Sequence, residues 1–426
     1  MYSTVAPERP IPVHGDGERP MKVLVFPLTW VLAHVGRTIE IAKALRARGH
    51  EVVFAGDDPT HPSSRLSHAI ANGFRTVHVE EPKWHFAWKR FHDHGALCGI
   101  YDFFTHSRWA PLETILEDMI RVTQEEKPDL LLGDASLGVS TVGHILGIPA
   151  AGVLNAYNTE FFRPWGFYRG LIRGCDKMFW KPTRDRLYAK YGVKNVDAFE
   201  LLENTPLLSP DLEDFHAPHG SYPLWRPIGP LLSEPPAPLP AWYDELADGK
   251  TNIYITMGST GLLEPILNRS YETLARAPYR FIVTTGNQVS QETIDRAPAN
   301  FRFAAYAPGS KLLQHCAAMV FHGGNGSMYQ ALAAGVPMLA LPSHLEQHAS
   351  FRPAIREGFG RKASARKITG EKLLAEIDLL VNDPSYRTNA WRHRGPVLHA
   401  NAAQTAAKML EKHAFTQGMR TQSALA

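Results

Sequence analysis

The stretch FHGGNGSMYQALAAGVP (Phe321 to Pro337) decides how the second half of the chain folds. It follows the apolar run 318–320, which is typical of a buried strand, and leads into a helical segment that stops at Gly335. A strand end, a glycine loop and a helix N-terminus together present free backbone N–H groups and a partial positive charge. The stretch therefore predicts a phosphate-binding turn in a parallel α/β sheet. A tight turn without a ligand is the alternative.

The glycines match neither of the common phosphate motifs. G-x-G-x-x-G would need glycine at position 329, where Tyr329 stands, and no Gly-Lys-Ser/Thr triplet occurs. A second loop follows another predicted strand of the same half and carries Gly258, Ser259 and Thr260. Because parallel strands bring their carboxyl ends to one edge of the sheet, we expect the two loops to bind one diphosphate from opposite sides.

Short apolar runs alternate with amphipathic segments along the whole chain. Strands are predicted at 22–26, 51–55, 76–79, 130–132, 150–154, 253–256, 281–284, 318–321 and 338–341, with helices at 36–48, 112–125, 137–146 and 400–412. This alternation predicts an α/β fold of two doubly wound, Rossmann-like domains that face each other across a cleft. The expected organisation is a disordered tail (1–20), a first domain (21–228), a proline-rich linker (229–240), a second domain (241–399), and a C-terminal helix with a disordered tail (400–426).

Composition describes a soluble globular protein. The 426 residues are 44% hydrophobic and 20% charged, with a net charge of +3 from scattered basic residues, which disfavours nucleic acid as a partner. Three cysteines without C-x-x-C spacing suit a reducing cytoplasm. No apolar run approaches the roughly 18 residues of a membrane span. Residues 1–20 lack the apolar core of a signal peptide, so we expect a cytoplasmic protein.

Two segments, 82–109 and 161–191, are unusually rich in aromatic residues. They are either ordinary packing of long insertions or the wall of a pocket for a large, greasy ligand. The pocket hypothesis names as its candidate residues Trp84, Trp88, Phe91, Phe104 and, after a predicted strand, Asn155. His92 and His94 within the first segment are either a metal-ligand pair or, as we favour, part of a polar surface or pocket edge.

The segment from Tyr306 to Gln347 resembles the donor-binding signature of family 1 nucleotide-sugar glycosyltransferases, which have the GT-B fold. The order of its elements agrees: an aromatic-Ala-Pro turn, His-Gly-Gly-x-Gly-Ser, Gly-Val-Pro and an acidic-Gln pair. The resemblance implies that Tyr306 stacks on the nucleobase beside Ala307 and that Glu346 and Gln347 bind the sugar. It assigns the diphosphate to the glycine loops and their neighbours, namely Gly258, Ser259, Thr260, His322, Gly323, Gly324, Asn325, Gly326 and Ser327.

Two positions depart from the family pattern. Gln330 stands where many relatives have a glutamate for the ribose hydroxyls, which leaves UDP and dTDP open as the donor nucleotide. Gly309 replaces a glutamine that is usual in plant members. Base recognition is therefore expected to rest more on the backbone.

Transfer of a sugar to a hydroxyl needs a base that removes the acceptor proton, and histidine suits that task near neutral pH. The family has such a histidine in the loop after the first strand, which corresponds to His34 here, and its partner aspartate corresponds to Asp134. A carboxylate fixes the histidine tautomer and stabilises the imidazolium that forms. The alternatives are a loop histidine that packs or caps, and a helix N-cap aspartate.

The resulting hypothesis is an inverting hexosyltransferase of natural-product or antibiotic biosynthesis. It moves sugar from a UDP- or dTDP-sugar to a hydroxyl of a lipophilic small molecule, and needs neither a metal nor a cofactor besides that co-substrate. A non-catalytic nucleotide-sugar-binding partner of another transferase and a nucleotide-sugar epimerase are the alternatives. The presence of His34, Glu346 and Gln347 argues against the first, and the greasy insertions argue against the second.

Overall fold

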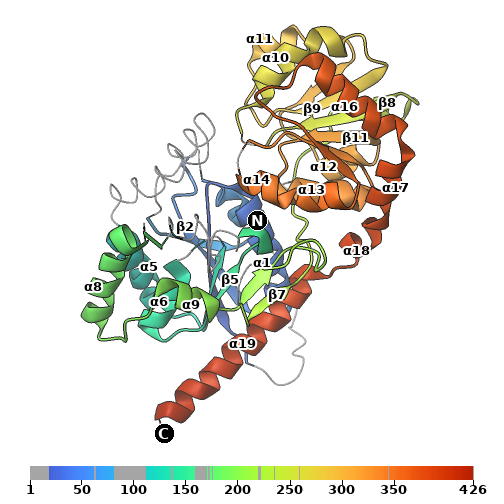
Figure 1. Ribbon diagram of the computed structural model, residues 1–426. Helices are drawn as coiled ribbons and strands as arrows, with labels where there is room; N and C mark the ends of the chain where they lie inside the picture. The colour runs from blue at the N-terminus through green and yellow to red at the C-terminus, as the bar shows by residue number, and fades with distance from the viewer. Residues whose placement is uncertain are drawn as a thin grey trace, which may run out of the picture.

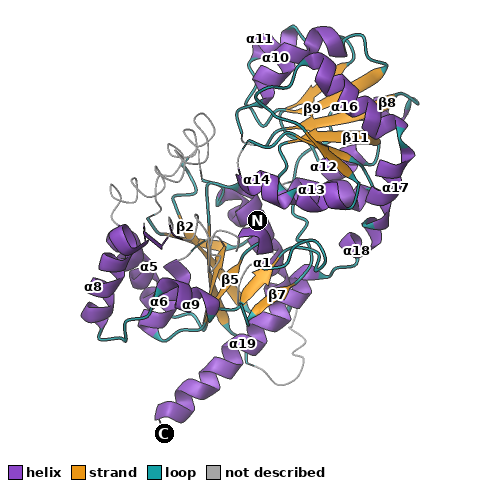
Figure 2. Cartoon of the chain, in the orientation of Figure 1, coloured by secondary structure: helices purple, strands orange, loops and turns teal. Residues whose placement is uncertain are grey.

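The computed structural model contains two domains, each built on one parallel sheet (Figure 1 and Figure 2). The α/β class predicted from the alternating pattern is therefore confirmed. The structure describes residues 19–61, 64–80, 112–134, 136, 138–158, 170, 173–174, 176–218, 222–234, 236–258, 260–343 and 345–425.

The sheet of the first domain has seven strands in the order β3-β2-β1-β4-β5-β6-β7, all parallel. Its described elements are β1 (Lys22–Pro27), α1 (Leu32–Ala47), β2 (Glu51–Gly56), α2 (Ser67–Ala71), β3 (Arg75–His78), α5 (Leu112–Glu126), β4 (Leu130–Asp134), α6 (Gly138–Leu146), β5 (Ala150–Val153), η2 (Asp176–Trp180), α8 (Lys181–Tyr191), α9 (Ala198–Glu203), β6 (Leu207–Ser209) and β7 (Trp225–Pro227).

The second domain repeats the arrangement with six parallel strands in the order β10-β9-β8-β11-β12-β13. Its elements are η3 (Tyr243–Ala247), β8 (Thr251–Thr256), α10 (Leu263–Leu274), β9 (Tyr279–Thr284), α11 (Gln291–Asp295), β10 (Phe301–Ala304), α12 (Gly309–Leu313), β11 (Cys316–Phe321), α13 (Asn325–Ala334), β12 (Met338–Ala340), α14 (Leu345–Ser350), α15 (Arg352–Arg356), β13 (Gly360–Lys362), α16 (Gly370–Asn382), α17 (Pro384–Arg392), α18 (Arg394–Leu398) and α19 (Ala402–Leu425).

Both faces of each sheet are covered, which explains why the strands read as continuous apolar runs. Along β1, Val23 and Val25 join the core under α1, whereas Leu24 and Phe26 join the core under α5, α6 and α8. Side chains alternate between the two faces of a strand, so both sets must be apolar when both faces are buried. Each such side chain contributes about 1.5–3 kcal/mol on burial.

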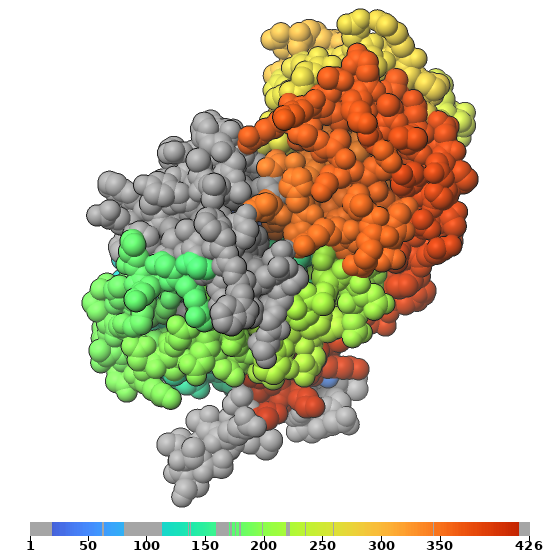
Figure 3. All heavy atoms as spheres, in the orientation of Figure 1, coloured from blue at the N-terminus to red at the C-terminus, as the bar shows by residue number. Residues whose placement is uncertain are grey.

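The last helix leaves the domain that precedes it and packs on the first domain. Helix α19 runs beneath the first sheet in Figure 1, and its residues Ala406 and Leu410 lie in the same core as α1. An ion pair between Arg48 and Glu411 (2.5 Å) and a hydrogen bond from His413 Nε2 to the Ala150 carbonyl oxygen (3.1 Å) tie it there. In the space-filling view of Figure 3, the red part of this helix lies at the bottom of the molecule, below the green part of the first domain. The sequence did not predict this return.

Several predicted boundaries were wrong. The predicted helix 400–412 continues to Leu425, so the expected disordered tail after residue 412 is helical up to that residue. Helix α1 begins at Leu32 instead of residue 36, which places His34 in its first turn and not in a loop. The short strands β6, β7, β10 and β13 were missed; β7 is a three-residue strand that ends on a proline.

Each sheet has a point where the strand order reverses, between β1 and β4 and between β8 and β11. Ligands of doubly wound sheets bind outside the carboxyl ends of the strands at such points. His34 and Asp134 follow or end the strands at the first point, and the two glycine loops follow the strands at the second. The topology therefore brings all the predicted site residues of the described chain to two facing edges.

Candidate functional site

A cavity of ≈ 1300 Å³ lies between the two domains and is lined by both switch points. This volume exceeds the roughly 300–1,000 Å³ of an ordinary single-ligand pocket. Its walls include His34 from the first domain and Gly258, Gly324 and Glu346 from the second. The cavity has room for two substrates that meet between the domains.

His34 and Asp134 form the predicted pair. Helix α1 carries His34 into the cavity, and the end of β4 carries Asp134, so that His34 Nδ1 lies 2.6 Å from Asp134 Oδ1. The Asp134 side chain is 0% exposed and the His34 side chain 20% exposed. With Nδ1 donating to the carboxylate, Nε2 is the ring nitrogen that remains to accept a proton. The pair therefore has the geometry of a base and its orienting carboxylate.

Arg37, which the sequence analysis missed, binds the same carboxylate. Its Nε donates to Asp134 Oδ2 and its Nη2 to Asp134 Oδ1, while Nη2 also lies 3.1 Å from His34 Nδ1. Burial alone would lower the pKa of the Arg37 guanidinium, but the charge and hydrogen bonds of Asp134, with smaller contributions from Tyr157 and Asp211, together raise that pKa. Burial would likewise raise the pKa of the Asp134 carboxyl, yet Arg37 and His34 hold it below its usual value. Asp134 is thus kept ionised.

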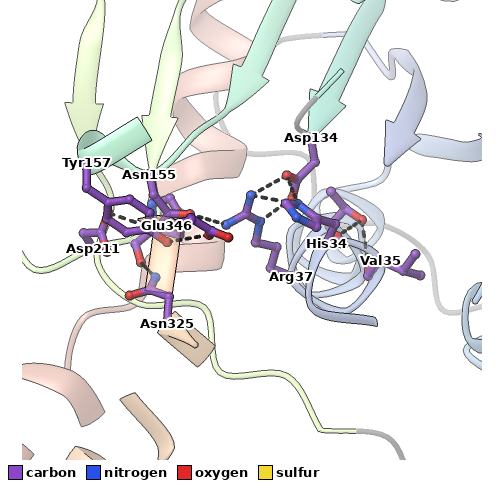
Figure 4. Close-up of polar contacts among 11 residues, drawn as sticks. His34, Val35, Arg37, Asp134, Asn155, Tyr157, Asp211, Asn325 and Glu346 are labelled. Carbon is purple, nitrogen blue, oxygen red and sulfur yellow. Dashed lines mark hydrogen bonds and ion pairs between the residues drawn. The ribbon is translucent and has the colours of Figure 1, made fainter. Parts of the chain in front are cut away.

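A buried chain of hydrogen bonds continues from Arg37 toward the second domain (Figure 4). Arg37 Nη1 donates to Asn155 Oδ1 (2.7 Å), and Asn155 Nδ2 donates to Asp211 Oδ2 (3.0 Å). Tyr329 of α13 donates its hydroxyl to Asp211 Oδ1 (3.3 Å) and accepts from the Leu212 backbone N–H (2.9 Å). These hydrogen bonds connect the His34–Asp134 pair to the helix that follows the main glycine loop.

Asn155 lines the cavity, so its role as an acceptor ligand stays a prediction, but this network gives it a structural role as well. The residue is 2% exposed, and both ends of its amide bind protein groups. Burying such an amide is favourable only while those bonds are kept. Asn155 therefore holds Arg37 in place.

The glycine loops close around the ring of His322. A Cβ on Gly324 would lie 2.3 Å from His322 Nε2, and a Cβ on Gly258 would lie 2.9 Å from His322 Cε1. Gly323 has φ +90° and packs near the Gln347 carbonyl oxygen, whereas a Cβ on Gly326 would meet nothing within 4 Å. Some of the glycines therefore make room for His322 itself, and Gly326 faces open space at the start of α13.

The remaining predicted donor residues surround the same half of the cavity. Tyr306 is 50% exposed, which leaves a ring face available for stacking. Glu346 Oε1 accepts a hydrogen bond from Tyr157 of the first domain (3.2 Å), and Gln347 Oε1 accepts from the Ser343 backbone N–H (2.8 Å). The predicted donor residues among the cavity-lining side chains and loops are Gly258, Thr260, Tyr306, Ala307, His322, Gly324, Asn325, Gly326, Ser327, Gln330, Glu346 and Gln347.

Tyr157 is a second residue that the sequence did not reveal. It is 1% exposed, and burial together with the nearby Glu346 carboxylate raises the pKa of its phenol well above the ordinary value. The phenol stays protonated and can only donate to Glu346 in this arrangement. Its hydrogen bond links the first domain to the predicted sugar-binding residue.

Some predictions concern residues outside the described part of the chain: Ser259 of the second glycine loop, the aromatic candidates Trp84, Trp88, Phe91 and Phe104, and the histidines His92 and His94. Among the described residues, no three His, Cys, Asp or Glu side chains gather as a metal site. Within the same ranges, every helix is too short or too polar to span a bilayer.

Comparisons with known proteins agree with this geometry. Residues 272–412 match the family described as "Erythromycin biosynthesis protein CIII-like, C-terminal domain". The chain is 26% identical over 409 residues to a PGL/p-HBAD biosynthesis glycosyltransferase of Mycobacterium tuberculosis, with 88% of each chain covered. It is 25% identical over 411 residues to the 4'-demethylrebeccamycin synthase of Lentzea aerocolonigenes, with 89% of this chain and 96% of that protein covered.

Solved structures confirm the fold. The spinosyn rhamnosyltransferase SpnG complexed with thymidine diphosphate superposes with a TM-score of 0.69 at 19% identity, covering 92% of this chain and 100% of that one. The His34–Asp134 pair and the glycine loops line one cavity, as expected for a glycosyltransferase, and the relatives are named as glycosyltransferases. The chain is a glycosyltransferase of the GT-B fold, and it is similar to family 1 enzymes of the natural-product type.

Proposed function

We propose that the protein is an inverting, metal-independent hexosyltransferase that acts in the cytoplasm. It moves a sugar from a UDP- or dTDP-sugar to a hydroxyl group of a lipophilic natural product. The observation that carries the proposal is the His34–Asp134 pair (2.6 Å), which lines the same cavity as the glycine loop before α13. A base on one wall and an anion-binding loop on the other are the two requirements of this transfer.

His34 acts as the base in this scheme. Its Nε2 takes the proton of the acceptor hydroxyl while the acceptor oxygen forms a bond to the anomeric carbon. The bond between that carbon and the diphosphate oxygen breaks, and its electron pair leaves with the nucleoside diphosphate. Asp134 stabilises the imidazolium from the Nδ1 side. A single displacement of this kind inverts the anomeric configuration.

The leaving diphosphate is stabilised by protein groups at the start of α13. The helix is ten residues long and presents its free N–H groups and its positive dipole end at Asn325 and Gly326. The Ser327 hydroxyl also lines the cavity at this point. These groups supply the positive potential that a divalent cation supplies in other transferases, so the scheme requires no metal.

The acceptor half of the cavity is largely apolar in its described part. Its wall includes Trp30, Val31, Ile115, Met119 and Trp180. An apolar surface of this kind favours a lipophilic acceptor over a free sugar. The curated relatives are named for rebeccamycin and for PGL/p-HBAD biosynthesis, which supports a natural-product or glycolipid acceptor.

The donor can be determined before the acceptor is known. A panel of UDP- and dTDP-sugars, incubated with the enzyme without acceptor, is scored for slow release of the nucleoside diphosphate. We expect one nucleotide class to be hydrolysed, and we expect the rate to be the same after EDTA treatment. Loss of activity in EDTA and its return with Mn²⁺ would overturn the metal-free scheme. Retention of the anomeric configuration in the product would overturn the single displacement.

A further inference from the structure

A recess beside Gly309 brings together oxygen atoms from three separate segments. A Cβ on Gly309 would lie 3.4 Å from Glu234 Oε1, 3.5 Å from Gln330 Oε1 and 3.5 Å from the Tyr254 hydroxyl. These residues line the interdomain cavity, as does Tyr306. Gly309 lines the cavity too, so the part of the cavity beside it is bordered by hydrogen-bonding oxygens.

The recess presents mainly acceptors. Glu234 Oε1 accepts from the Ser310 backbone N–H (3.0 Å) and Oε2 from the Ser310 hydroxyl (2.6 Å), which occupies only two of the roughly four acceptor positions of a carboxylate. Gln330 Nε2 donates to the Ser233 carbonyl oxygen (3.3 Å), so its Oε1 is the end that faces the recess. A ligand group that fills this space must donate hydrogen bonds, as a hydroxyl does.

The recess lies where the pentose of a bound nucleotide must pass. Gln330 is one helical turn beyond the diphosphate-binding end of α13, and Gly309 follows the Tyr306 turn that carries the nucleobase in the proposed function. The pentose connects the base to the diphosphate. Gln330 itself cannot offer a carboxylate to pentose hydroxyls, but Glu234 places one beside it.

We propose that Glu234, from the linker, is the carboxylate that binds a hydroxyl of the donor's pentose. This inference rests on the proposed function and names a specificity residue for the donor. A carboxylate that accepts from a ligand hydroxyl makes a charge-assisted hydrogen bond, which neutral amides do not match. Glu234 thus supplies from another segment the charge that position 330 lacks.

The test uses UDP and two analogues, 2'-deoxyUDP and 3'-deoxyUDP, which differ from it by one hydroxyl each. Calorimetry on the full-length protein gives the affinity penalty for losing each hydroxyl. We expect at least one penalty of roughly tenfold to hundredfold in the unmodified protein. In Glu234→Ala the same penalty falls below about threefold, because the partner of that hydroxyl is gone.

Two control variants separate this role from a structural one. Ser310→Ala removes a side-chain anchor of Glu234 but keeps the carboxylate, and Glu40→Ala removes a cavity-lining carboxylate that pairs with Lys43 (2.9 Å). Both controls are expected to keep the full penalty. Penalties that are the same in Glu234→Ala as in the unmodified protein would refute the role of Glu234 and leave the donor site intact. Failure of both UDP and dTDP to bind the unmodified protein would instead refute the proposed function.

Discussion

Replacing Arg37 by methionine tests the buried centre of the site. Methionine keeps a long, flexible side chain but removes the charge and the donors. Arg37 donates to both oxygens of Asp134, whose side chain is 0% exposed, and a third donor binds the Asn155 amide at 2.7 Å. The substitution leaves the Asp134 carboxylate buried with His34 as its remaining side-chain partner among those described.

The expected cost follows from the burial of that carboxylate. Breaking a buried ion pair by removing one partner costs about 3–5 kcal/mol, because the other charge stays desolvated and uncompensated. Whole proteins are stable by only about 5–15 kcal/mol, so the first domain should lose a large share of its stability. Arg75 offers a control, since it forms a similar two-nitrogen pair with Glu126, but its own side chain is 50% exposed and the 13% exposed Glu126 keeps Lys22 as a second partner (2.7 Å). Arg75→Met should cost less than about 1 kcal/mol.

Urea denaturation followed by circular dichroism measures both variants. A third variant, Arg37→Met with Asp134→Asn, removes the uncompensated charge as well. Its cost should be clearly smaller than the sum of the costs of the two single substitutions, because the residues share one interaction. If Arg37→Met costs no more than Arg75→Met, or if the double variant is additive, the buried pair does not have the energy assigned to it here.

Three further predictions concern the base, the glycine loop and pH. His34→Ala should lower the transfer rate by about 10²- to 10⁴-fold while UDP or dTDP affinity, measured by calorimetry, stays nearly the same; loss of nucleotide binding would mean that His34 has another role. A Cβ at position 326 would meet no protein atom within 4 Å, so Gly326→Val should weaken nucleotide binding without lowering the stability of the protein. A Cβ at position 324 would lie 2.3 Å from His322 Nε2, so Gly324→Val should lower both nucleotide affinity and stability. Unchanged nucleotide affinity in both variants would contradict the phosphate role of the loop. Burial lowers the pKa of His413 below its ordinary value. The contribution of neutral His413 to the stability of the fold is therefore present above about pH 6.5 and is lost as the pH falls through the lower pKa of the folded state. The melting temperature should drop between pH 7 and pH 5.5, and His413→Gln should reduce that drop.

The fold was predictable because its strands are buried on both faces. A run such as Leu130–Leu132 needs no tertiary information to be recognised as a strand, and the glycine loop after residue 321 marks a strand-helix turn by its composition. The topology then follows from chain order, because alternating strands and helices form parallel sheets with few permitted arrangements. For the same reason, His34 and Asp134 could be placed at one sheet edge before their 2.6 Å contact was seen.

Arg37 and Tyr157 could not be found in this way. An arginine on a helix ordinarily marks the solvent-exposed face, and a tyrosine after a strand ordinarily packs in a core. Only one local signal pointed to Arg37: it lies three residues after His34, which puts both side chains on one face of a helix. Its partners Asp134 and Asn155 are distant in sequence, and their pairing depends on strand order and register.

The linker shows most clearly what composition leaves open. The prolines of residues 229–240 predict an interdomain linker but not its contacts: a Cβ on Gly36 of α1 would lie 2.7 Å from Ser233 Oγ, and Gln330 of α13 donates to the Ser233 carbonyl oxygen (3.3 Å). Ser233 therefore contacts both the helix that carries His34 and the helix that follows the main glycine loop. Because His34 is two residues from Gly36, we expect the distance between His34 and the glycine loop before α13 to depend on this contact as well as on the stiffness of the proline segment. A side chain at position 36 would press on the Ser233 hydroxyl, so we expect Gly36→Ala to shift this contact and, in the proposed function, to lower the transfer rate although position 36 contacts neither substrate.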